Sequence, residues 1–297
     1  MGHGFGDLLA LVCRSLGERG ARVVAVEEYG HGRHRRIIRA HGLRTAALPV
    51  DGDGADVSRL EECGADAVLL TPAHQFPTGV PLSAERRGRL VRWARRTGAL
   101  IVEDDYDGEF RFDRRAIGAL QALAPDHVLY AGTASKALAP GIGLAWAVAP
   151  PSLLPELMEA RGTAGGGQDA VNQLALAEFV RGHDYDRHVR RLRHLYRSRR
   201  EAVDAAVTDR LPDCRVTGLR AGLHCLVELP DGVREDVVEA ESARRGLALE
   251  GLGRFAEGSA GARRPGVVVG YGAPRAHRFP EALAVAAASI RAARAGR

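Results

Sequence analysis

Short apolar segments alternate with helical patterns between Val23 and Ala149, and this alternation restricts the chain to few folds. A strand buried on both faces shows a continuous apolar run, and parallel strands need crossover connections that are usually helices. We therefore predict an α/β fold with a mostly parallel sheet covered by helices on both faces. The strands are predicted at residues 23–26, 45–50, 67–70 and 99–102, with another beginning at 128.

The helical patterns complete this unit and then introduce a second one. Helices are predicted at 7–16, 33–41, 57–62 and 84–97, the last capped by Ser83, and then at 153–160, 170–181 and 185–207. A smaller unit follows, with strands at 214–216, 223–229 and 267–270 and helices at 235–246 and 280–295. We predict a large domain over residues 1–205 and a small C-terminal domain over residues 206–297.

Lys136 is the only lysine of the chain. Lysine and arginine together number 42, so 42 − 1 = 41 are arginine, and arginine serves almost everywhere as the surface cation. A guanidinium stays charged, so it cannot replace lysine where chemistry needs a free amine. A single lysine between a buried strand and a Gly/Ser/Pro turn is a candidate nucleophile that forms a Schiff base. A surface lysine kept by chance is the alternative.

Polar groups follow several of the predicted strands. Ligands of open α/β sheets bind at the carboxyl ends of the strands. The loop at 71–79, which contains His74, the acidic cluster at Asp104 and the turn at Lys136 all fall at such ends. Asp104 could keep a cofactor ring nitrogen protonated, and Tyr106 could hydrogen-bond its phenolic oxygen. A solvated acidic pair at the end of a strand is the alternative for Asp104 and its neighbour.

Two further segments could hold a phosphate. Thr133 and Ser135 place hydroxyl groups next to Lys136. Gly4, Phe5 and Gly6 precede the first predicted helix, so they could offer backbone N–H groups and a helix N-terminus to an anion. Flexibility of the N-terminus is the other interpretation of these glycines.

Four segments together resemble a known family. They are Glu103 to Phe112 (EDDYDGEFRF), Gly132 to Gly141 (GTASKALAPG), the HQFPTG sequence within Thr71 to Gly79, and Gly270-Tyr271. They are similar to the aminotransferase-like domain of MocR-type regulators, GntR-family transcription factors that join an N-terminal winged helix to a fold-type I pyridoxal 5′-phosphate (PLP) domain. The resemblance covers nearly the whole chain.

The resemblance implies a cofactor and roles for the candidate residues. PLP would form a Schiff base with Lys136, Asp104 would pair with its pyridine nitrogen, and Tyr106 with its phenolic oxygen. Thr133 and Ser135 would lie on the phosphate side. The implied fold is a three-layer large domain plus a small C-terminal α/β domain, assembled as a homodimer with the site at the subunit interface.

The chain also departs from the family pattern. Members usually carry Arg seven residues after the lysine, where this chain has Gly143, and Gln where it has Asp7. His31 occupies a position that is commonly aromatic, and its imidazole can still stack on a ring. We expect PLP binding to be weaker as a result. We also expect that the winged helix and the first part of the PLP domain do not precede Met1, so DNA would be bound only through a domain absent from this chain.

Three functions stay open. The first is a PLP-sensing effector domain of a regulator, with an amino acid as a possible second ligand. The second is a stand-alone PLP-dependent aminotransferase of class I/II, and the third is a dimerisation module without cofactor. An aminotransferase needs an arginine to bind the substrate carboxylate, and the strand at Val267-Val268-Val269 offers none where such enzymes often place it.

Composition excludes several other classes. No apolar run is long enough to cross a membrane, and no signal peptide opens the chain. The four cysteines show no metal spacing, the histidines form no HExxH or HxH pair, and we expect reduced thiols in a cytoplasmic protein without a metal. The net charge of +5 is spread along the chain. The Arg-rich run at 185–200 fits the solvated face of a helix better than a nucleic-acid contact.

Overall fold

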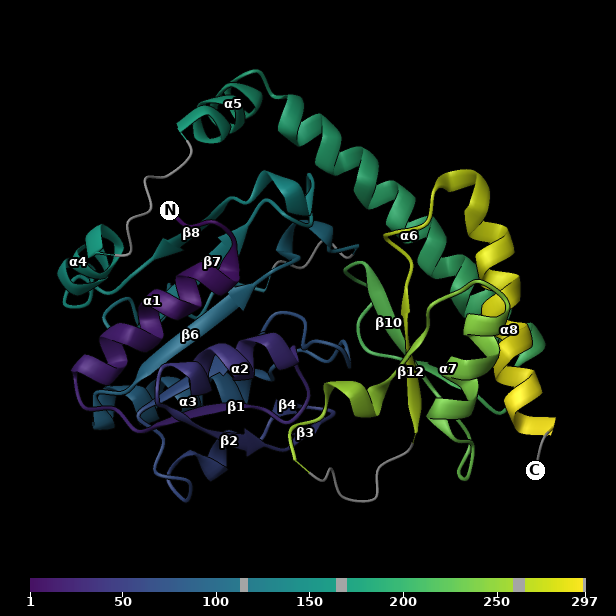
Figure 1. Ribbon diagram of the computed structural model, residues 1–297, viewed down its shortest axis with the longest axis horizontal. Coiled ribbons are helices and arrows are strands. Elements are labelled where there is room, and N and C mark those ends of the chain that lie inside the picture. The colour runs from purple at the N-terminus through teal and green to yellow at the C-terminus, as the bar shows by residue number, and fades with distance from the viewer. Residues whose placement is uncertain (113–116, 164–169, 259–264, 296–297) are drawn as a thin grey trace.

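The computed structural model describes residues 1–112, 117–163, 170–258 and 265–295, and Figure 1 shows its two sheets. Within these residues the larger sheet has six strands in the order β2-β1-β5-β6-β7-β8. Five of them are parallel, and β8 joins the edge antiparallel to β7. The strands are β1 (Val23–Glu27), β2 (Arg44–Leu48), β5 (Ala67–Leu70), β6 (Leu100–Asp105), β7 (Val128–Thr133) and β8 (Ala145–Val148).

Helices cover both faces of this sheet, as the apolar strands require. On one face, Val24, Val102 and Leu129 share a core with α1 (Phe5–Glu18) and α2 (Gly32–Ala40). On the other face, Val68 and Ile101 share a core with α3 (Ala84–Thr97) and the 3-10 helix Val57–Leu60. Alternate residues of one strand thus belong to opposite cores, and the large domain has three layers.

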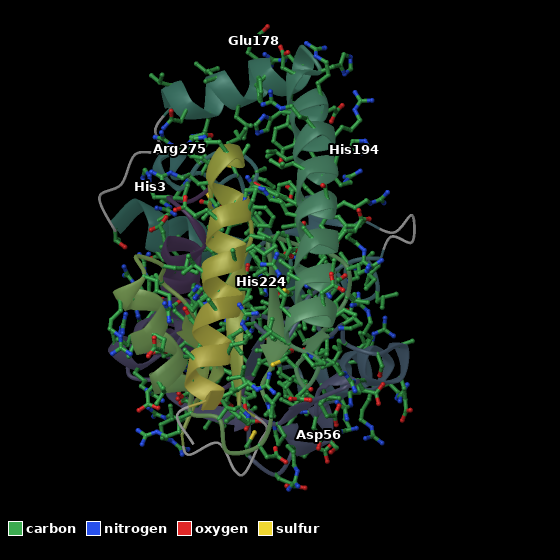
Figure 2. All side chains as sticks on the ribbon, turned by 90° about the vertical axis from the view of Figure 1, so that its right-hand side faces the viewer. His3, Asp56, Glu178, His194, His224 and Arg275 are labelled. Carbon is green, nitrogen blue, oxygen red and sulfur yellow. The ribbon has the colours of Figure 1, made fainter. Side chains whose placement is uncertain are left out.

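A smaller antiparallel sheet, ordered β11-β12-β10-β9, forms the second centre of the fold. One of its faces packs against α6, α7 and α8 in a common core, and α6 and α8 lie close together over it (Figure 2). The bounds are α4 (Leu154–Thr163), α5 (Ala170–Arg181), α6 (Asp184–Arg210), β9 (Arg215–Thr217), β10 (His224–Glu228), α7 (Glu235–Arg244), β11 (Glu250–Gly251), β12 (Gly266–Gly270) and α8 (Phe279–Ala295).

The second face of the small sheet turns toward the large one. Leu226 of β10 and Leu252 pack with Tyr29 and Phe255, and Val50 of the short hairpin β3 (Val50–Asp51) and β4 (Gly54–Ala55) joins this cluster. Because successive residues of a strand point to opposite faces, His224 lies on the same face as Leu226. The cluster therefore holds the two sheets together beside the carboxyl ends of β1 and β5.

The sequence predicted most of these elements. The helices at 84–97 and 170–181 and the strand at 67–70 have the predicted bounds, and Ser83 caps α3 by accepting a hydrogen bond from Arg86 N. The strand predicted at 99–102, followed by the acidic segment, corresponds to β6, which begins at Leu100 and continues through Asp104 to Asp105. β8, β11 and the β3–β4 hairpin were not predicted. The domain boundary at residue 205 stays a prediction.

The structure also bears on the cysteines and on the expected absence of a membrane-spanning segment. Cys13, Cys63, Cys214 and Cys225 are all free thiols, and Cys13 and Cys225 are buried. Among the residues that the structure describes, no helix combines the length and the apolar character that crossing a membrane would need.

Replacement of Ile101 by Ala should destabilise the protein strongly. Ile101 is fully buried between β6 and α3, and removing its outer carbons leaves a cavity as well as lost apolar burial. We expect a loss of about 2–5 kcal/mol in the free energy of unfolding, measured by urea denaturation. Leu123→Ala, at a side chain that is 51% exposed, is the control and should stay within about 0.5 kcal/mol of the wild type. Equal losses in both variants would contradict the assigned core.

Candidate functional site

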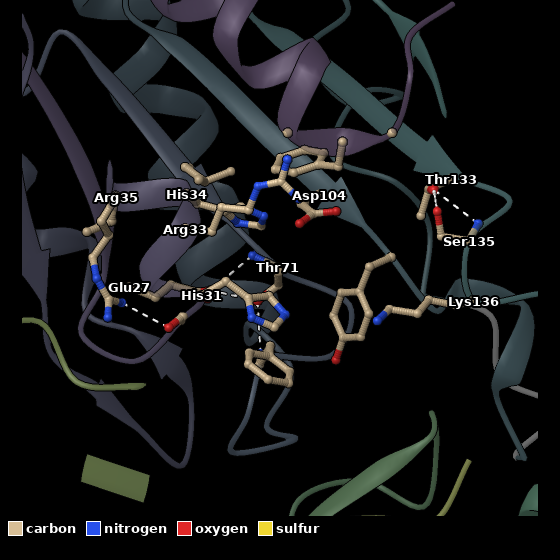
Figure 3. Close-up of a pocket in the computed structure, with 18 of the residues that line it drawn as sticks. Glu27, His31, Arg33, His34, Arg35, Thr71, Asp104, Thr133, Ser135 and Lys136 are labelled. Atoms are coloured by element: carbon tan, nitrogen blue, oxygen red, sulfur yellow. Dashed lines mark hydrogen bonds between the residues drawn. The ribbon is translucent and has the colours of Figure 1, made fainter. Parts of the chain in front are cut away.

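A cavity of about 270 Å³ opens at the carboxyl ends of the parallel strands. Its size is near the lower limit of small-molecule pockets, which span about 300–1,000 Å³. Figure 3 shows Asp104, Thr133, Ser135 and Lys136 around this space, together with residues from the start of α2. All sequence-predicted site residues except His74 line it, and they are Gly4, Phe5, Gly6, His31, Asp104, Tyr106, Thr133, Ser135 and Lys136.

Asp104 is the buried carboxylate of the cavity. It lies on the face of β6 that α1 and α2 cover, because Val102 two residues earlier belongs to that core. Its side chain is 5% exposed and has no hydrogen-bond or ion-pair partner among residues 1–112, 117–163, 170–258 and 265–295. Burial raises its pKa well above the usual value, and the nearby charges of Asp105, Asp107 and Glu27 add to the shift. Lys136 lowers the pKa of Asp104, but this does not offset the effect of burial and of the neighbouring carboxylates.

Lys136 extends into the cavity from the turn after β7. The turn begins at Ala134, whose N–H donates to Leu144 O, and Leu138 N closes it by donating to Ala134 O. Lys136 itself is exposed toward the open space, while Ala134 and Ala137 on either side are fully buried. The buried alanines anchor the turn and leave the amine accessible.

Thr133 and Ser135 form a small hydroxyl pair beside the lysine. Their side-chain oxygens are 3.0 Å apart, and Ser135 N–H donates to Thr133 Oγ1 at 3.2 Å. Thr133 lies on the same sheet face as Asp104, since Leu129 and Ala131 of β7 belong to the α1/α2 core. The same cavity is closed by the N-terminus of α1, where Gly4 adopts a φ of 99° that favours glycine.

His74 lies behind the cavity wall, where it contacts Tyr106. The Tyr106 hydroxyl is 3.1 Å from His74 Nδ1 and donates to His74 O at 3.1 Å. Asp107 Oδ2 is 2.8 Å from the same ring nitrogen, and His74 is 3% exposed. Burial raises the pKa of Tyr106 well above its usual value, so the phenol stays protonated and keeps a hydrogen to donate. His74 thus positions Tyr106.

His224 completes a buried group with His74 and Asp107. The two rings are 5.2 Å apart between centroids, and Nε2 of each histidine has no partner among the described residues. Burial lowers the pKa of His224 well below its usual value, so its ring is neutral. Within the described parts of the chain, these three residues are the one His/Cys/Asp/Glu group close enough to hold a metal ion. The sequence signal for them was weak because they come from three distant segments.

His31 stands at the mouth of the cavity. Its ring stacks on Phe76 with centroids 4.0 Å apart and an 18° angle between planes. Phe5 of the α1 N-terminus contacts His34 in a tilted arrangement, with ring centroids 4.8 Å apart and a 55° angle between planes. These aromatic contacts form one wall, and His31 can offer its ring face to a flat ligand.

Sequence reasoning missed several charged residues of the cavity, among them Glu27, Arg33 and Arg35. Glu27 ends β1, so the strand-end rule that selected Asp104 could also have found it. Burial raises its pKa to about 7, although the N–H and hydroxyl of Thr71 donate to Glu27 Oε2 at 3.1 and 2.6 Å. Arg35 is fully engaged, with an ion pair to Glu257 at 2.9 Å and hydrogen bonds to the backbone oxygen atoms of Gly30, Phe255 and Ala256.

Asp7 does not point an unpaired charge at the α1 N-terminus. Its Oδ2 accepts hydrogen bonds from Arg161 Nη2 at 2.6 Å and from His3 N at 2.9 Å. Burial alone would raise the pKa of Asp7, but these contacts outweigh it and lower the pKa overall. The ion pair with Arg161 thus offsets the repulsion that the carboxylate of Asp7 would otherwise exert on a phosphate.

Comparison with protein families identifies this arrangement. Residues 1–250 match the model of the family described as "Aminotransferase class I and II". The chain belongs to that family. The pyridoxine biosynthesis transcriptional regulator PdxR of Corynebacterium glutamicum is 36% identical over 266 residues, covering 89% of this chain and 56% of the regulator. The regulator YdeL of Bacillus subtilis is 34% identical over 222 residues, covering 73% and 48%. The chain spans about half the length of these relatives.

Solved structures confirm the fold. The α-aminoadipate aminotransferase LysN of Thermus thermophilus, solved with N-(5′-phosphopyridoxyl)-L-leucine, aligns with all of this chain and 77% of its own, with a TM-score of 0.87 and 24% identity. A kynurenine aminotransferase of Pyrococcus horikoshii covers 98% of this chain and 74% of its own, with a TM-score of 0.85 and 24% identity. The predicted α/β fold of the PLP-dependent transferases is confirmed.

Replacement of Glu27 by Gln should change how stability depends on pH. The carboxyl releases its proton near pH 4.5 in the unfolded chain and near pH 7 in the folded one, so the folded state binds more protons between these values. Stability from this group is therefore lost as pH rises through that window. Between about pH 4.5 and pH 7, the free energy of unfolding of the ligand-free Glu27→Gln variant should fall less than that of the wild type. Urea unfolding at several pH values measures this difference. The exposed Glu85→Gln is the control, and parallel curves for wild type and Glu27→Gln would refute the assignment.

Proposed function

We propose that this chain is a PLP-binding, aminotransferase-like effector domain of a transcriptional regulator, with PLP attached covalently through Lys136. One observation carries the proposal. The only lysine of the chain opens onto a cavity that also contains a buried carboxylate, Asp104, without a partner among the described residues. An amine for the Schiff base and an acidic partner for the ring nitrogen are the groups that a PLP ring requires, and the phenol of Tyr106 lies in the same space.

The residues present fit the cofactor at each end of its ring. Asp104 would hold a proton on the ring nitrogen, and the cationic N–H would give this carboxylate a direct ion-pair partner. Tyr106, positioned by His74, would donate its hydroxyl hydrogen toward the phenolic oxygen. When bound, PLP supplies an electrophilic carbonyl carbon and a ring that withdraws electrons. His31 would cover one face of the cofactor ring, and its imidazole would then stack on PLP instead of on Phe76.

The phosphate would bind where Thr133, Ser135 and the N-terminus of α1 meet. Backbone N–H groups at the start of a helix are unpaired and carry a partial positive charge, which favours an anion. Gly4 lets the chain turn tightly into α1, and Gly6 adds no side chain of its own to the first turn. Gly143 contributes no cation, so affinity depends on the other groups.

The regulators among the relatives support a sensing role. This chain spans about half of PdxR and of the probable rhizopine catabolism regulatory protein MocR of Rhizobium meliloti, which is 29% identical over 248 residues. A regulator of this type would bind DNA through a separate winged-helix domain, and an amino acid would act as the second ligand of the PLP site. The free cysteines support a reducing compartment, and we place the protein in the cytoplasm.

A homodimer is part of this proposal. Helices α4 and α5 expose several large apolar side chains. Monomeric soluble proteins usually expose such side chains only singly. Val171 is 74% exposed, Leu174 67% and Met158 63%. A second copy of the chain would cover them, in keeping with a fold that builds its site at a subunit interface.

An aminotransferase is the second candidate, because the matching structures include enzymes such as LysN. In that case Lys136 would also move a proton between the substrate Cα and the cofactor. A substrate carboxylate then needs an arginine partner, and β12 supplies none. A dimerisation module without cofactor is the third candidate. This third candidate predicts a dimer that gains no visible absorption band from a Schiff base when PLP is added.

Titration of the purified protein with PLP tests the covalent role of Lys136. The wild type should gain a visible absorption band from the Schiff base, and Lys136→Ala should not gain it, because no other lysine exists to replace the amine. Asp104→Asn should weaken PLP binding by about tenfold or more, since it removes the charge that pairs with the ring nitrogen. Absence of a band in the wild type would reject both cofactor-dependent functions and leave the dimerisation module.

Amino acids added to the PLP-loaded protein separate a sensor from an enzyme. A sensor should show a band shift that is fully restored when the amino acid is removed, with no accumulation of keto acid. Multiple turnovers to keto acid in the presence of an amino acceptor would favour the aminotransferase. Lys136→Ala is the matched control for either response.

A further inference from the structure

The phosphate side of the cavity described above is short of positive charge. Thr133 Oγ1 already accepts from Ser135 N and lies 3.1 Å from Leu144 O, to which it donates. Gly143 has open space around it and no side chain. A phosphate that carries nearly two charges, held only by neutral donors, would be poorly compensated for the water it loses. A cation is needed nearby.

Arg33 is the residue in position to supply that cation. It lies in the first turn of α2 and lines the same cavity as Thr133 and Ser135. A Cβ atom built on Gly6 would be 3.5 Å from Arg33 Cζ and 3.5 Å from Nη2. The guanidinium therefore lies against the first turn of α1, where the unpaired N–H groups are. Figure 3 shows Arg33 directed into the space around Asp104.

The guanidinium of Arg33 is also uncommitted. Among the residues that the structure describes, it has no hydrogen-bond or ion-pair partner. The other arginines near the site are engaged: Arg35 and Arg39 with Glu257, and Arg161 with Asp7. A guanidinium presents several N–H groups in one plane and binds phosphate through two of them at once. A guanidinium without a protein partner beside a helix N-terminus is therefore suited to bind an anion.

We propose that Arg33 binds the phosphate of PLP together with the N-terminus of α1, and supplies the positive charge that Gly143 does not. The inference rests on the proposed function for the identity of the ligand. It assigns Arg33 as a cofactor-binding residue that discriminates between phosphorylated and unphosphorylated pyridoxal. Arg161 assists indirectly, because its ion pair with Asp7 keeps that carboxylate from opposing the phosphate.

Binding of PLP and of pyridoxal to the full chain tests the proposal. Both can react with Lys136, but only PLP carries the phosphate. Arg33→Ala should weaken PLP binding roughly 10-fold to 100-fold, as expected for lost hydrogen bonds to a charged group, and should leave pyridoxal binding unchanged. Arg33→Lys should restore part of the PLP affinity, since it returns the charge without the planar pair of donors. Arg36→Ala, exposed on the same helix, should behave as wild type.

Inorganic phosphate gives a second measurement that does not depend on Lys136. Phosphate should raise the melting temperature of the wild type and of Lys136→Ala, and should do so much less for Arg33→Ala. Equal weakening of PLP and pyridoxal in Arg33→Ala, or no weakening of either, would overturn the proposal while leaving PLP binding intact. A wild type that is stabilised by phosphate but forms no Schiff base would instead reject the proposed function and keep Arg33 as an anion site.

Discussion

The register between β6 and β7 is the constraint on which the site depends. Asp104 pairs with Ala131, and Asp105 with Gly132, so the strand that carries the carboxylate ends beside the strand that leads to Lys136. A shift by one residue would move every side chain of β6 to the opposite face. Asp104 would then leave the cavity, and Glu103, which accepts hydrogen bonds from Leu120 N and Gln121 N on the α3 face, would replace it. The two buried cores fix this register, because Ile101 and Val102 fit only one face each.

The cavity is electrostatically incomplete without a ligand. Asp104 and Glu27 have raised pKa values because burial disfavours their charged forms, while Lys136 and Arg33 point positive charge at the same space. A ligand with a basic ring nitrogen at one end and a phosphate at the other would compensate both kinds of group. Groups with perturbed pKa values in one cleft are typical of functional sites. A purely structural dimerisation module would have no use for this pattern.

Much of the fold and part of the site could be predicted from the sequence, for physical reasons. Buried parallel strands such as β5 are continuous apolar runs, and α3 has a clear cap, so their bounds were predictable. The edge strand β8 was missed because it is partly exposed and antiparallel, so it lacks that pattern. Lys136 was found through its chemical uniqueness. Arg33 and His224 were missed because only tertiary packing, which no local pattern reports, brings them to the cavity or behind it.

The missing cation at Gly143 bears on the choice between sensor and enzyme. A catalyst has to hold its cofactor through every turnover, so it would need strong contacts to the phosphate as well as to the ring. A sensor of PLP has to release the cofactor when its concentration falls, and a single exposed guanidinium supports that better than a buried cluster of charges. Because Arg33 is solvent-exposed, salt screens part of its attraction for the phosphate, and PLP affinity should fall as ionic strength rises. A site with fewer charges on the phosphate would thus suit a protein that reports the concentration of its ligand better than it suits a catalyst.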